Sequence, residues 1–545
     1  MHSKSTKYTV ILFLVSLVML TANLGILPVN IMEARNLITA REMVQDGNWI
    51  LTTLNGFPRY EKPPLPTWIT AVLGAIFGFN SLFVLRLAVV AVTLLLIVYA
   101  YKLSVKIGLS EKQGFHNGLI LATSFYIYFS GRDNQWDIYC HSFMFVSIFF
   151  LWKILKKSKK PFIDAVLGGI FLACSILSKG PVSPYGLLLP FLIAYGWIYK
   201  FKFENKTAIV LIIYALIGII LGASWSIYAH WADPKAFAKM AQTETERWSS
   251  DYNSEPFYYY WSFFTQSGIW TITSLLALIY PYLKNKVSDV KAYKFTLIWT
   301  LASLILLSLI PEKKVRYLLP VLIPLALNTG FYVDFLWKNA GNLTLKADKF
   351  LMIFSFGLVG VIGIAYPFVL FSVFHHVVEK QMIWSAVSSF VLFFTGIFIL
   401  YFLAKKDFPK VFYGLIALQC AVMVACFPLV KSFLHNPNAR SAKTLQEITH
   451  RKIPVFDYEY GSPEIIWDYG DKTRSADMKI IEKELVTKDT VGVLVMKNLE
   501  SDFFKKINPN LSIQKVSYID INTSAPSSKG YKPRLYRDFY FVIKK

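Results

Sequence analysis

The chain has 545 residues, of which 55% are hydrophobic and only 17% charged. Soluble globular domains carry nearer a quarter charged residues, so this composition excludes a soluble globular protein, a disordered chain, a coiled coil and collagen. The net charge of +23 would suit a nucleic-acid-binding protein, but most lysines lie in short clusters between apolar runs, as the positive-inside rule expects. We therefore expect a polytopic membrane protein without a nucleic-acid partner.

Apolar stretches long enough to cross a bilayer recur over the first 430 residues. A span needs about 20 mostly apolar residues, and we count about thirteen such stretches. The first runs from Tyr8 to Leu27, and because no small-residue cleavage site follows it, we interpret it as an uncleaved anchor. Lysine-rich loops alternate with lysine-poor ones, which predicts a cytoplasmic N-terminus and an outward-facing C-terminus.

The first predicted outer loop, residues 28–80, is rich in charges and aromatics. Apolar residues between 37 and 44 predict an amphipathic helix in the membrane interface, and Asp46-Gly-Asn48 ends it with turn-forming residues. Pro63-Pro64 then starts a second short helix beside Lys62. A solvated charged helix face is the plain interpretation, but a functional site is favoured by the compact set of Glu33, Arg35, Arg59, Glu61 and Lys62.

Later outer loops add further acids and cations. In the second outer loop Asp137 opens an apolar helix, and His141 follows one turn later on the same face. Asp137 is equally suited to be a helix-capping carboxylate, and His141 fits a core or supporting residue better than a metal ligand. Snorkelling explains single cations, whereas an anionic ligand at the membrane surface explains a group of them. The group is Lys179, Arg247, Lys313, Lys314 and Arg316.

After Val430 the sequence becomes polar and rich in turn residues. Residues 453–457, 490–496 and 538–543 read as strands, and residues 442–450 and 475–485 as helices. We expect two domains, a membrane domain over residues 1–434 and a small α/β domain over residues 435–545 on the outer face. This outer domain shows no catalytic motif.

Acids and cations beside a membrane suit one chemistry. A carboxylate can act as general base toward an acceptor hydroxyl, while Arg and Lys hold a phosphate and stabilise the charge on it as it leaves. The sequence has no Walker motif, GxGxxG fingerprint or paired Cys/His motif, so no cofactor or metal site is indicated, and metal dependence stays open. The four cysteines lie in apolar segments and read as small core residues.

The chain resembles the PMT-type superfamily of membrane glycosyltransferases with the GT-C fold, and most closely the bacterial lipid A 4-amino-4-deoxy-L-arabinose transferases. The resemblance rests on Met32-Glu-Ala-Arg35, Ala40-Arg-Glu-Met43, Asn55-Gly56 and Glu61-Lys-Pro-Pro-Leu65, and continues at Lys179-Gly-Pro181, Glu246-Arg-Trp248 and Lys314-Val-Arg-Tyr-Leu-Leu-Pro320. It implies an all-α polytopic membrane fold, interfacial helices in the first outer loop and a periplasmic C-terminal domain. It also implies a location in the bacterial inner membrane.

The resemblance further implies sugar transfer with inversion from an undecaprenyl-phosphate donor. Lys62 would bind the donor phosphate with help from Arg247 and Tyr317, and Asp137 matches the second acidic position of the family. Further phosphate contacts and supporting residues are assigned to Arg59, Lys314, Arg316, Arg35, Glu61, Lys179 and His141. The family's Asp-Glu pair is Met32-Glu33 here, so either Glu33 or Asp137 is the base, or this branch uses different chemistry.

We therefore expect a glycosyltransferase that acts on a lipid A, glycan or protein acceptor at the periplasmic face, with 4-amino-4-deoxy-L-arabinose as the sugar that the resemblance suggests. One alternative is a transporter or flippase of lipid-linked anions, which would use the same cations but tolerate Glu33→Gln. The other is a non-catalytic scaffold, whose charged loops would accept substitution freely.

Overall fold

The computed structural model describes residues 2–202, 204–249, 254–434, 436–450 and 452–545, without the side chains of residues 2–4 and 247–249. The chain forms two compact units. Unit 1 comprises Met1–Gly25, Tyr60–Ile69 and Asn80–Leu429, and unit 2 comprises Ile26–Arg59, Thr70–Phe79 and Val430–Lys545. The C-terminal residues thus share a unit with most of the first outer loop, while the predicted division at residue 434 stays a prediction.

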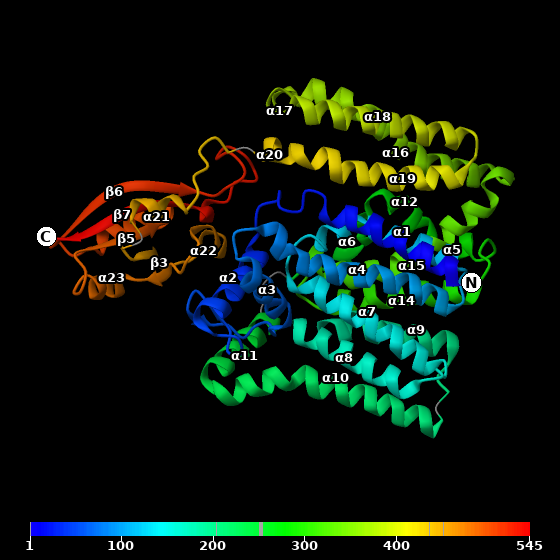
Figure 1. Ribbon diagram of the computed structural model, residues 1–545, viewed down its shortest axis with the longest axis horizontal. Helices are drawn as coiled ribbons and strands as arrows, with labels where there is room; N and C mark the ends of the chain where they lie inside the picture. The colour runs from blue at the N-terminus through cyan, green and yellow to red at the C-terminus, as the bar shows by residue number, and fades with distance from the viewer. Residues whose placement is uncertain (1, 203, 250–253, 435, 451) are drawn as a thin grey trace. The chain divides into compact units, whose positions relative to one another are not determined.

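Unit 1 is helical (Figure 1). Its α-helices are α1 (His2–Thr21), α4 (Leu82–Ile107), α5 (Glu111–Thr123), α6 (Phe125–Ser130), α7 (Trp136–Leu155), α8 (Pro161–Lys179), α9 (Leu189–Tyr199), α10 (Asn205–Ala232), α11 (Pro234–Ser249), α12 (Thr271–Leu278), α13 (Tyr280–Leu283), α14 (Val290–Leu309), α15 (Leu319–Asn339), α16 (Lys346–Val373), α17 (His375–Lys380), α18 (Met382–Ala404) and α19 (Phe408–Ala421). The helix α3 (Leu65–Phe77) begins in unit 1 and ends in unit 2.

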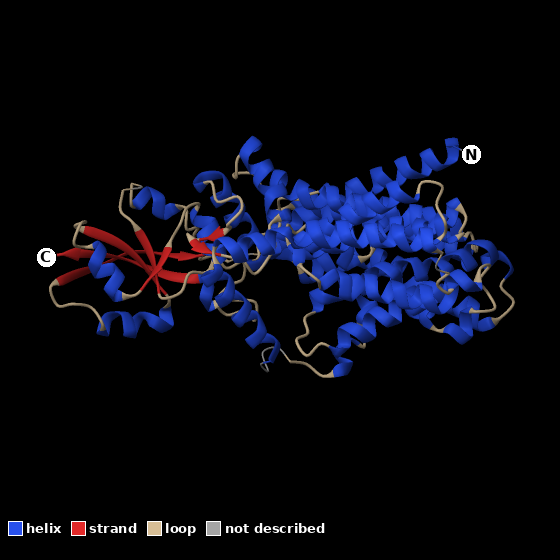
Figure 2. Ribbon diagram, turned by 90° about the horizontal axis from the view of Figure 1, so that it is seen from below, coloured by secondary structure: helices blue, strands red, loops and turns tan. Residues whose placement is uncertain are grey.

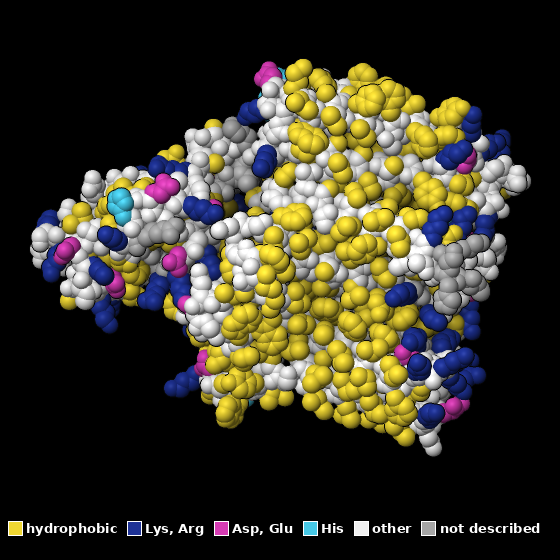
Figure 3. Space-filling view, viewed as in Figure 1, with side chains coloured by type: hydrophobic (Ala, Val, Ile, Leu, Met, Phe, Trp, Pro, Cys, Tyr) yellow, Lys and Arg dark blue, Asp and Glu magenta, His cyan; other side chains and the backbone are white. Residues whose placement is uncertain are grey.

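Within the described residues, nine helical segments are long and apolar enough to cross a membrane. Three more are apolar but shorter: Ser5–Thr21, Leu65–Phe77 and Pro184–Tyr199. Large hydrophobic side chains cover the flank of the helices, and lysines and arginines gather at their right-hand end in Figure 3. The all-α polytopic membrane fold is confirmed, whereas the count of about thirteen spans stays a prediction.

The centre of unit 1 is built around α7. This helix is apolar on all sides, and 89% of its most apolar window is buried, against 22% for α10; a helix that is hydrophobic all round belongs in a core. It packs against α4 and α8, and α8 packs against α10. At Gly218 of α10 an added Cβ would lie 2.3 Å from Leu172 of α8, so glycine permits the close approach of these two helices.

Unit 2 contains a five-stranded sheet in the order β4-β3-β5-β7-β6 (Figure 2). The strands β4, β3 and β5 are parallel, and β7 runs antiparallel to β5 and β6. The bounds are β3 (Val455–Tyr458), β4 (Arg474–Ala476), β5 (Thr490–Val495), β6 (Leu511–Asp520), β7 (Tyr536–Lys544), α20 (Val430–Phe433), α21 (Thr444–Ile448), α22 (Pro463–Tyr469), α23 (Met478–Glu484) and α24 (Glu500–Lys505).

Alternating side chains of this sheet enter two cores, as the period of a strand requires. Val491, Val493 and Val495 pack with Ile481 of α23 and Phe503 of α24. Leu494 lies in the other core, with Leu445 of α21, Ile465 of α22 and Phe539 of β7. The three predicted strands and both predicted helices are present with shifted ends; β4 occupies the start of the segment predicted as a helix at 475–485, and β6 was not predicted.

The first outer loop forms α2 (Ile31–Asp46) and a small hairpin, β1 (Thr53–Leu54) and β2 (Phe57–Pro58). Ala34 and Ile38 of α2 pack on Ile466 of α22, so the apolar stripe of α2 is covered within unit 2. Asn55 and Gly56 turn the hairpin with positive φ angles of 58° and 80°, the pattern of a type I′ turn. The buried carboxylate of Glu42 accepts the backbone N–H groups of both residues, at 2.6 and 3.2 Å.

Candidate active site

A buried ion pair joins the start of α7 to the end of α8. Asp137 lies in the first turn of α7, and α8 ends at Lys179 because Gly180 follows with a φ of 63°. The Lys179 ammonium pairs with Oδ1 of Asp137, and the two side chains are only 8% and 4% exposed. The other carboxylate oxygen, Oδ2, is buried and has no hydrogen-bond partner among the described residues. One acceptor atom of this pair is therefore available to another group.

The residues that follow Asp137 on α7 support this position. Nδ1 of the buried His141 lies 2.9 Å from Oγ of Ser183, so His141 ties α7 to the segment after α8. The Cys140 thiol donates to the Asp137 carbonyl at 3.2 Å, and Ser175 of α8 donates to the Cys140 carbonyl at 2.7 Å. These contacts fix the two helices side by side, which holds the carboxylate and the ammonium together.

The loop of residues 311–317 brings three cations, and each has a different environment. Lys313 is buried and donates to the Glu255 carbonyl at 2.7 Å. Lys314 pairs with Glu312 at 2.5 Å, and the Tyr317 hydroxyl donates to the same Glu312 oxygen at 3.2 Å. Burial disfavours ionised Glu312, but the hydrogen bond and charge of Lys314 outweigh it and hold the Glu312 pKa below its ordinary value. Lys313 and Lys314 are therefore both committed to protein partners.

Arg316 adds a positive charge near the buried pair. Its guanidinium interacts electrostatically with Asp137, and its Nε is buried without a hydrogen-bond partner in the part of the chain that the structure describes. The neighbouring ring of Tyr317 lies 5.3 Å from the Lys179 ammonium, measured to the ring centroid. The 311–317 loop and the ends of α7 and α8 thus meet at one place in unit 1.

Lys62 approaches this region from the first outer loop. Tyr60 is 5% exposed, and its hydroxyl donates to Oδ2 of Asp233, at the start of α11, over 2.9 Å. Burial first, and then this hydrogen bond and the Asp233 charge, raise the Tyr60 pKa to about 12. The anchored loop leaves the half-buried Lys62 within electrostatic range of Cys140, three residues after Asp137. Glu61, beside it, is exposed.

Four charged residues of the predicted site therefore converge in unit 1: Lys62, Asp137, Lys179 and Arg316. They comprise three cations and one carboxylate, which leaves an excess of two positive charges in a mostly buried setting. Such an excess, with a carboxylate oxygen and a guanidinium nitrogen that have no hydrogen-bond partner among the described residues, suits an anionic ligand that also presents a proton donor. The cluster can therefore bind a phosphate and accept a proton beside it.

The predicted site residues not yet placed lie in unit 2 or have side chains outside the described residues. Glu33, Arg35 and Arg59 belong to unit 2. Glu33 is fully buried in the first turn of α2, Arg35 is half-buried, and Arg59 donates to Oγ1 of Thr39 at 3.2 Å. The backbone of Arg247 lies in α11, and its side chain is outside the described part.

Sequence reasoning missed two neighbours of the cluster. Tyr126 of α6 interacts electrostatically with both Asp137 and Arg316, and Glu312 holds Lys314 and Tyr317 together. Glu312 carried a usable signal, because an acid two residues before a lysine in a short loop is a ready ion-pair partner. Tyr126 lies in a run of aromatics that is indistinguishable from core sequence.

Comparison with known proteins gives this geometry a context. Residues 61–225 match the family model described as dolichyl-phosphate-mannose-protein mannosyltransferase. The chain is 26% identical over 61% of its length to undecaprenyl phosphate-alpha-4-amino-4-deoxy-L-arabinose arabinosyl transferase 1 of Proteus mirabilis. It is 25% identical over 54% of its length to the corresponding transferase of Shewanella sediminis. The matched part spans 60% and 54% of these relatives' own lengths.

A solved structure extends the likeness over nearly the whole chain. ArnT from Cupriavidus metallidurans, bound to undecaprenyl phosphate, aligns with a TM-score of 0.71 at 16% sequence identity, covering 98% of this chain and 97% of that one. Its apo form aligns with a TM-score of 0.67. The resemblance seen in the sequence is thereby confirmed: this multi-pass membrane protein has the GT-C fold of ArnT and is similar in sequence to membrane glycosyltransferases that use lipid-phosphate sugar donors.

Proposed function

We propose that this protein is a membrane glycosyltransferase that moves a sugar from an undecaprenyl-phosphate carrier to an acceptor. The observation that carries the proposal is the convergence of Lys62, Lys179 and Arg316 around Asp137 with two positive charges in excess. A donor phosphodiester carries one negative charge, and the phosphate monoester released by transfer carries about 1.5 to 2 near neutral pH. The excess charge therefore matches the charge that develops on the leaving group.

The reaction follows from these groups. The acceptor hydroxyl or amine forms a bond to the anomeric carbon, the bond from that carbon to the phosphate oxygen breaks, and the electron pair leaves with the phosphate. The proton of the acceptor passes to a carboxylate. In unit 1 that carboxylate is Asp137, whose Oδ2 has no hydrogen-bond partner among the described residues, and Glu33 of unit 2 is the second candidate. Attack opposite the leaving phosphate inverts the anomeric centre.

The likeness to aminoarabinose transferases suggests the substrates and the setting. We propose 4-amino-4-deoxy-L-arabinose as the sugar and lipid A, or another surface glycan or protein, as the acceptor. The lysine-rich end of the helices is assigned to the cytoplasm. This assignment places the N-terminus inside and the transfer site with residues 435–545 in the periplasm. From the likeness we further propose a bacterial inner-membrane location, with residues 1–434 as the transferase domain.

The first test removes the proposed donor contact. Lys62→Ala should abolish transfer of the sugar from undecaprenyl phosphate to lipid A. Transfer is measured by mass spectrometry of lipid A from a deletion strain that carries each variant. Lys239→Ala, which removes an exposed cation from α11, is the matched control and should transfer normally. Full activity of Lys62→Ala at equal membrane abundance would refute the role of Lys62.

A second test separates transfer from transport and identifies the base. Glu33→Gln and Asp137→Asn preserve side-chain size but remove the basic carboxylate. Loss of transfer in only one of them names the base, and the other then serves as its control. If both variants leave sugar transfer unchanged and lipid-linked sugar still reaches the outer leaflet, the result would instead favour a transporter.

A further inference from the structure

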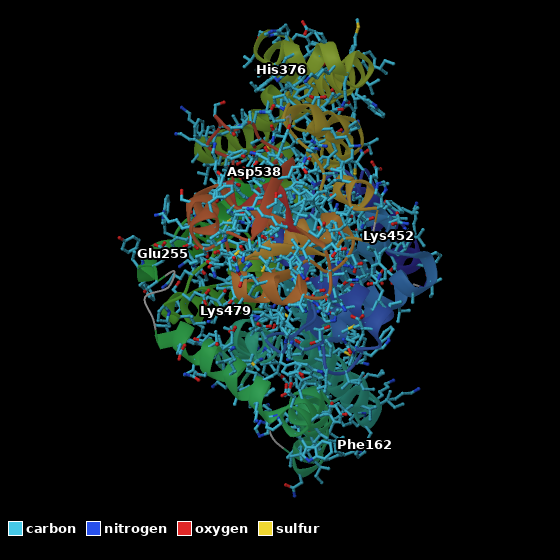
Figure 4. The ribbon with its side chains drawn as sticks, turned by 90° about the vertical axis from the view of Figure 1, so that its left-hand side faces the viewer. Phe162, Glu255, His376, Lys452, Lys479 and Asp538 are labelled. Carbon is cyan, nitrogen blue, oxygen red and sulfur yellow. The ribbon has the colours of Figure 1, made fainter. Side chains whose placement is uncertain are left out.

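An apolar groove opens on unit 1 along α16 and α18, at the edge opposite α8. Its volume is about 510 Å³, and ten of its twelve lining residues are apolar or glycine. The helices α16 to α18 form the upper edge of unit 1 in Figure 1, away from α10. In Figure 4 His376, on α17, and Phe162, at the start of α8, lie at opposite edges of the view. None of the residues that line the groove belongs to the Asp137 cluster, so the two are separate.

The length of the groove fits one leaflet of a bilayer. Along α16 it runs from Lys349 to Val361, which corresponds to about 18 Å of helix, against about 15 Å for half of the hydrocarbon core. Its wall is open to the surrounding lipid, since Ile353, Phe354 and Val361 are each about half exposed. A hydrocarbon chain of one leaflet can therefore enter the groove sideways.

Gly357 gives the groove its depth. A Cβ added at this residue would meet its nearest neighbour, Cδ2 of Leu403, only at 3.6 Å, which is ordinary van der Waals contact. Space therefore exists beside the glycine, and it is space that a bulky side chain would fill.

Two lysines stand at one end of the groove, Lys349 on α16 and Lys406 after α18. The carboxylates next to them in sequence are already engaged: Asp348 pairs with Lys286 at 2.5 Å, and Asp407 with Lys410 at 2.9 Å. Across the described residues, neither Lys349 nor Lys406 has a carboxylate within ion-pair distance. An apolar channel that ends in two uncompensated cations is complementary to an anionic head group on an acyl chain.

We propose that this groove binds an anionic glycerophospholipid, with one acyl chain along α16 and α18 and the phosphate between Lys349 and Lys406. The match to a single leaflet favours this lipid over a polyprenyl phosphate, whose chain is much longer than a leaflet. The inference needs no glycosyl transfer, so it stands or falls separately from the proposed function.

The test measures lipid selectivity of the full chain in mild detergent. Native mass spectrometry follows the binding of dioleoyl phosphatidylglycerol and dioleoyl phosphatidylcholine, which share acyl chains and differ in net charge. Two lysines near a phosphate should make the first lipid bind at least about tenfold more tightly. Lys349→Ala with Lys406→Ala should abolish this preference, whereas Lys346→Ala with Lys405→Ala, which removes two cations from the same ends outside the groove, should retain it.

Two further variants keep the result interpretable. Lys349→Arg with Lys406→Arg should restore the preference, and Gly357→Phe should weaken the binding of both lipids by filling the groove. Equal affinity for the two lipids, a preference that survives Lys349→Ala with Lys406→Ala, an equal loss in the matched control pair, or a loss of undecaprenyl phosphate binding in Lys349→Ala with Lys406→Ala would each overturn the proposal.

Discussion

Neutralising Asp137 and neutralising Lys179 should change the affinity for the donor in opposite directions. The four converging groups hold three cations and one carboxylate. Asp137→Asn raises the excess from two positive charges to three, and Lys179→Met lowers it to one. If the cluster binds a phosphate, the first change should tighten the binding of a polyprenyl phosphate and the second should weaken it. Transfer should fall in both variants, because Asp137→Asn removes a candidate base and Lys179→Met weakens donor binding.

The size of the effect follows from Coulomb's law. One unit charge at about 7 Å from a phosphate, at an effective dielectric constant of about 20, changes the interaction energy by about 2.4 kcal/mol. That energy corresponds to about fiftyfold in Kd. Salt and residual water in the site reduce it, so we expect changes of about tenfold or more in each direction.

Farnesyl phosphate, a short and soluble polyprenyl phosphate, is the suitable probe. Its Kd is measured by isothermal titration on the detergent-solubilised protein, with the double variant Asp137→Asn and Lys179→Met as the charge-matched control. The double variant should bind within a few fold of the wild type, because its excess of two charges is unchanged. Shifts of both single variants in the same direction would refute the electrostatic reasoning and indicate that the pair only holds α7 against α8.

Three further predictions test individual contacts in the two units. Tyr60→Phe should lower kcat/KM for transfer by about tenfold or more, because a hydrogen bond to a charged group contributes about 1.5–3 kcal/mol and this one fixes the loop of Lys62; an unchanged steady-state rate would contradict that. Arg537→Met should destabilise unit 2 by about 3–5 kcal/mol, because Arg537 and Asp457 form a fully buried pair at 2.9 Å; thermal unfolding measures the loss, and an unshifted transition would refute it. Glu42→Gln should speed amide hydrogen exchange at Asn55 and Gly56, and unaltered exchange would show that Glu42 does not hold the hairpin.

The sequence predicted those elements whose signal is local. The strand β5 is almost continuously apolar and β7 is rich in aromatics, so both were found. The strand β6 was missed because its first half is largely exposed and polar, and a bulge between Lys515 and Ser517 breaks its alternation. With only three residues, two of them polar, β4 carries almost no signal.

The division of the chain into two units could not be predicted from local sequence signals, for a different reason. Asn55 donates to the Thr473 carbonyl at 2.6 Å and accepts from its N–H at 3.0 Å, across 418 residues of sequence. Asp46 pairs with Lys472 at 2.7 Å in the same region. Neither contact leaves a pattern of spacing or periodicity, so the first outer loop read as part of the membrane domain, whereas most of it packs with the C-terminal residues in unit 2.

The candidate site shows why the position of a cation does not reveal its use. Lys313, Lys314 and Arg316 stand within four residues on one loop, and all three violate the expected shortage of cations there. Lys313 holds the Glu255 carbonyl, and burial lowers the Lys313 pKa. Lys314 is balanced by Glu312. Only Arg316 adds charge to the Asp137 cluster. Because the balance is set by carboxylates and carbonyls from other segments, a loop's surplus of cations predicts an anion site, while the packing decides which cation serves it.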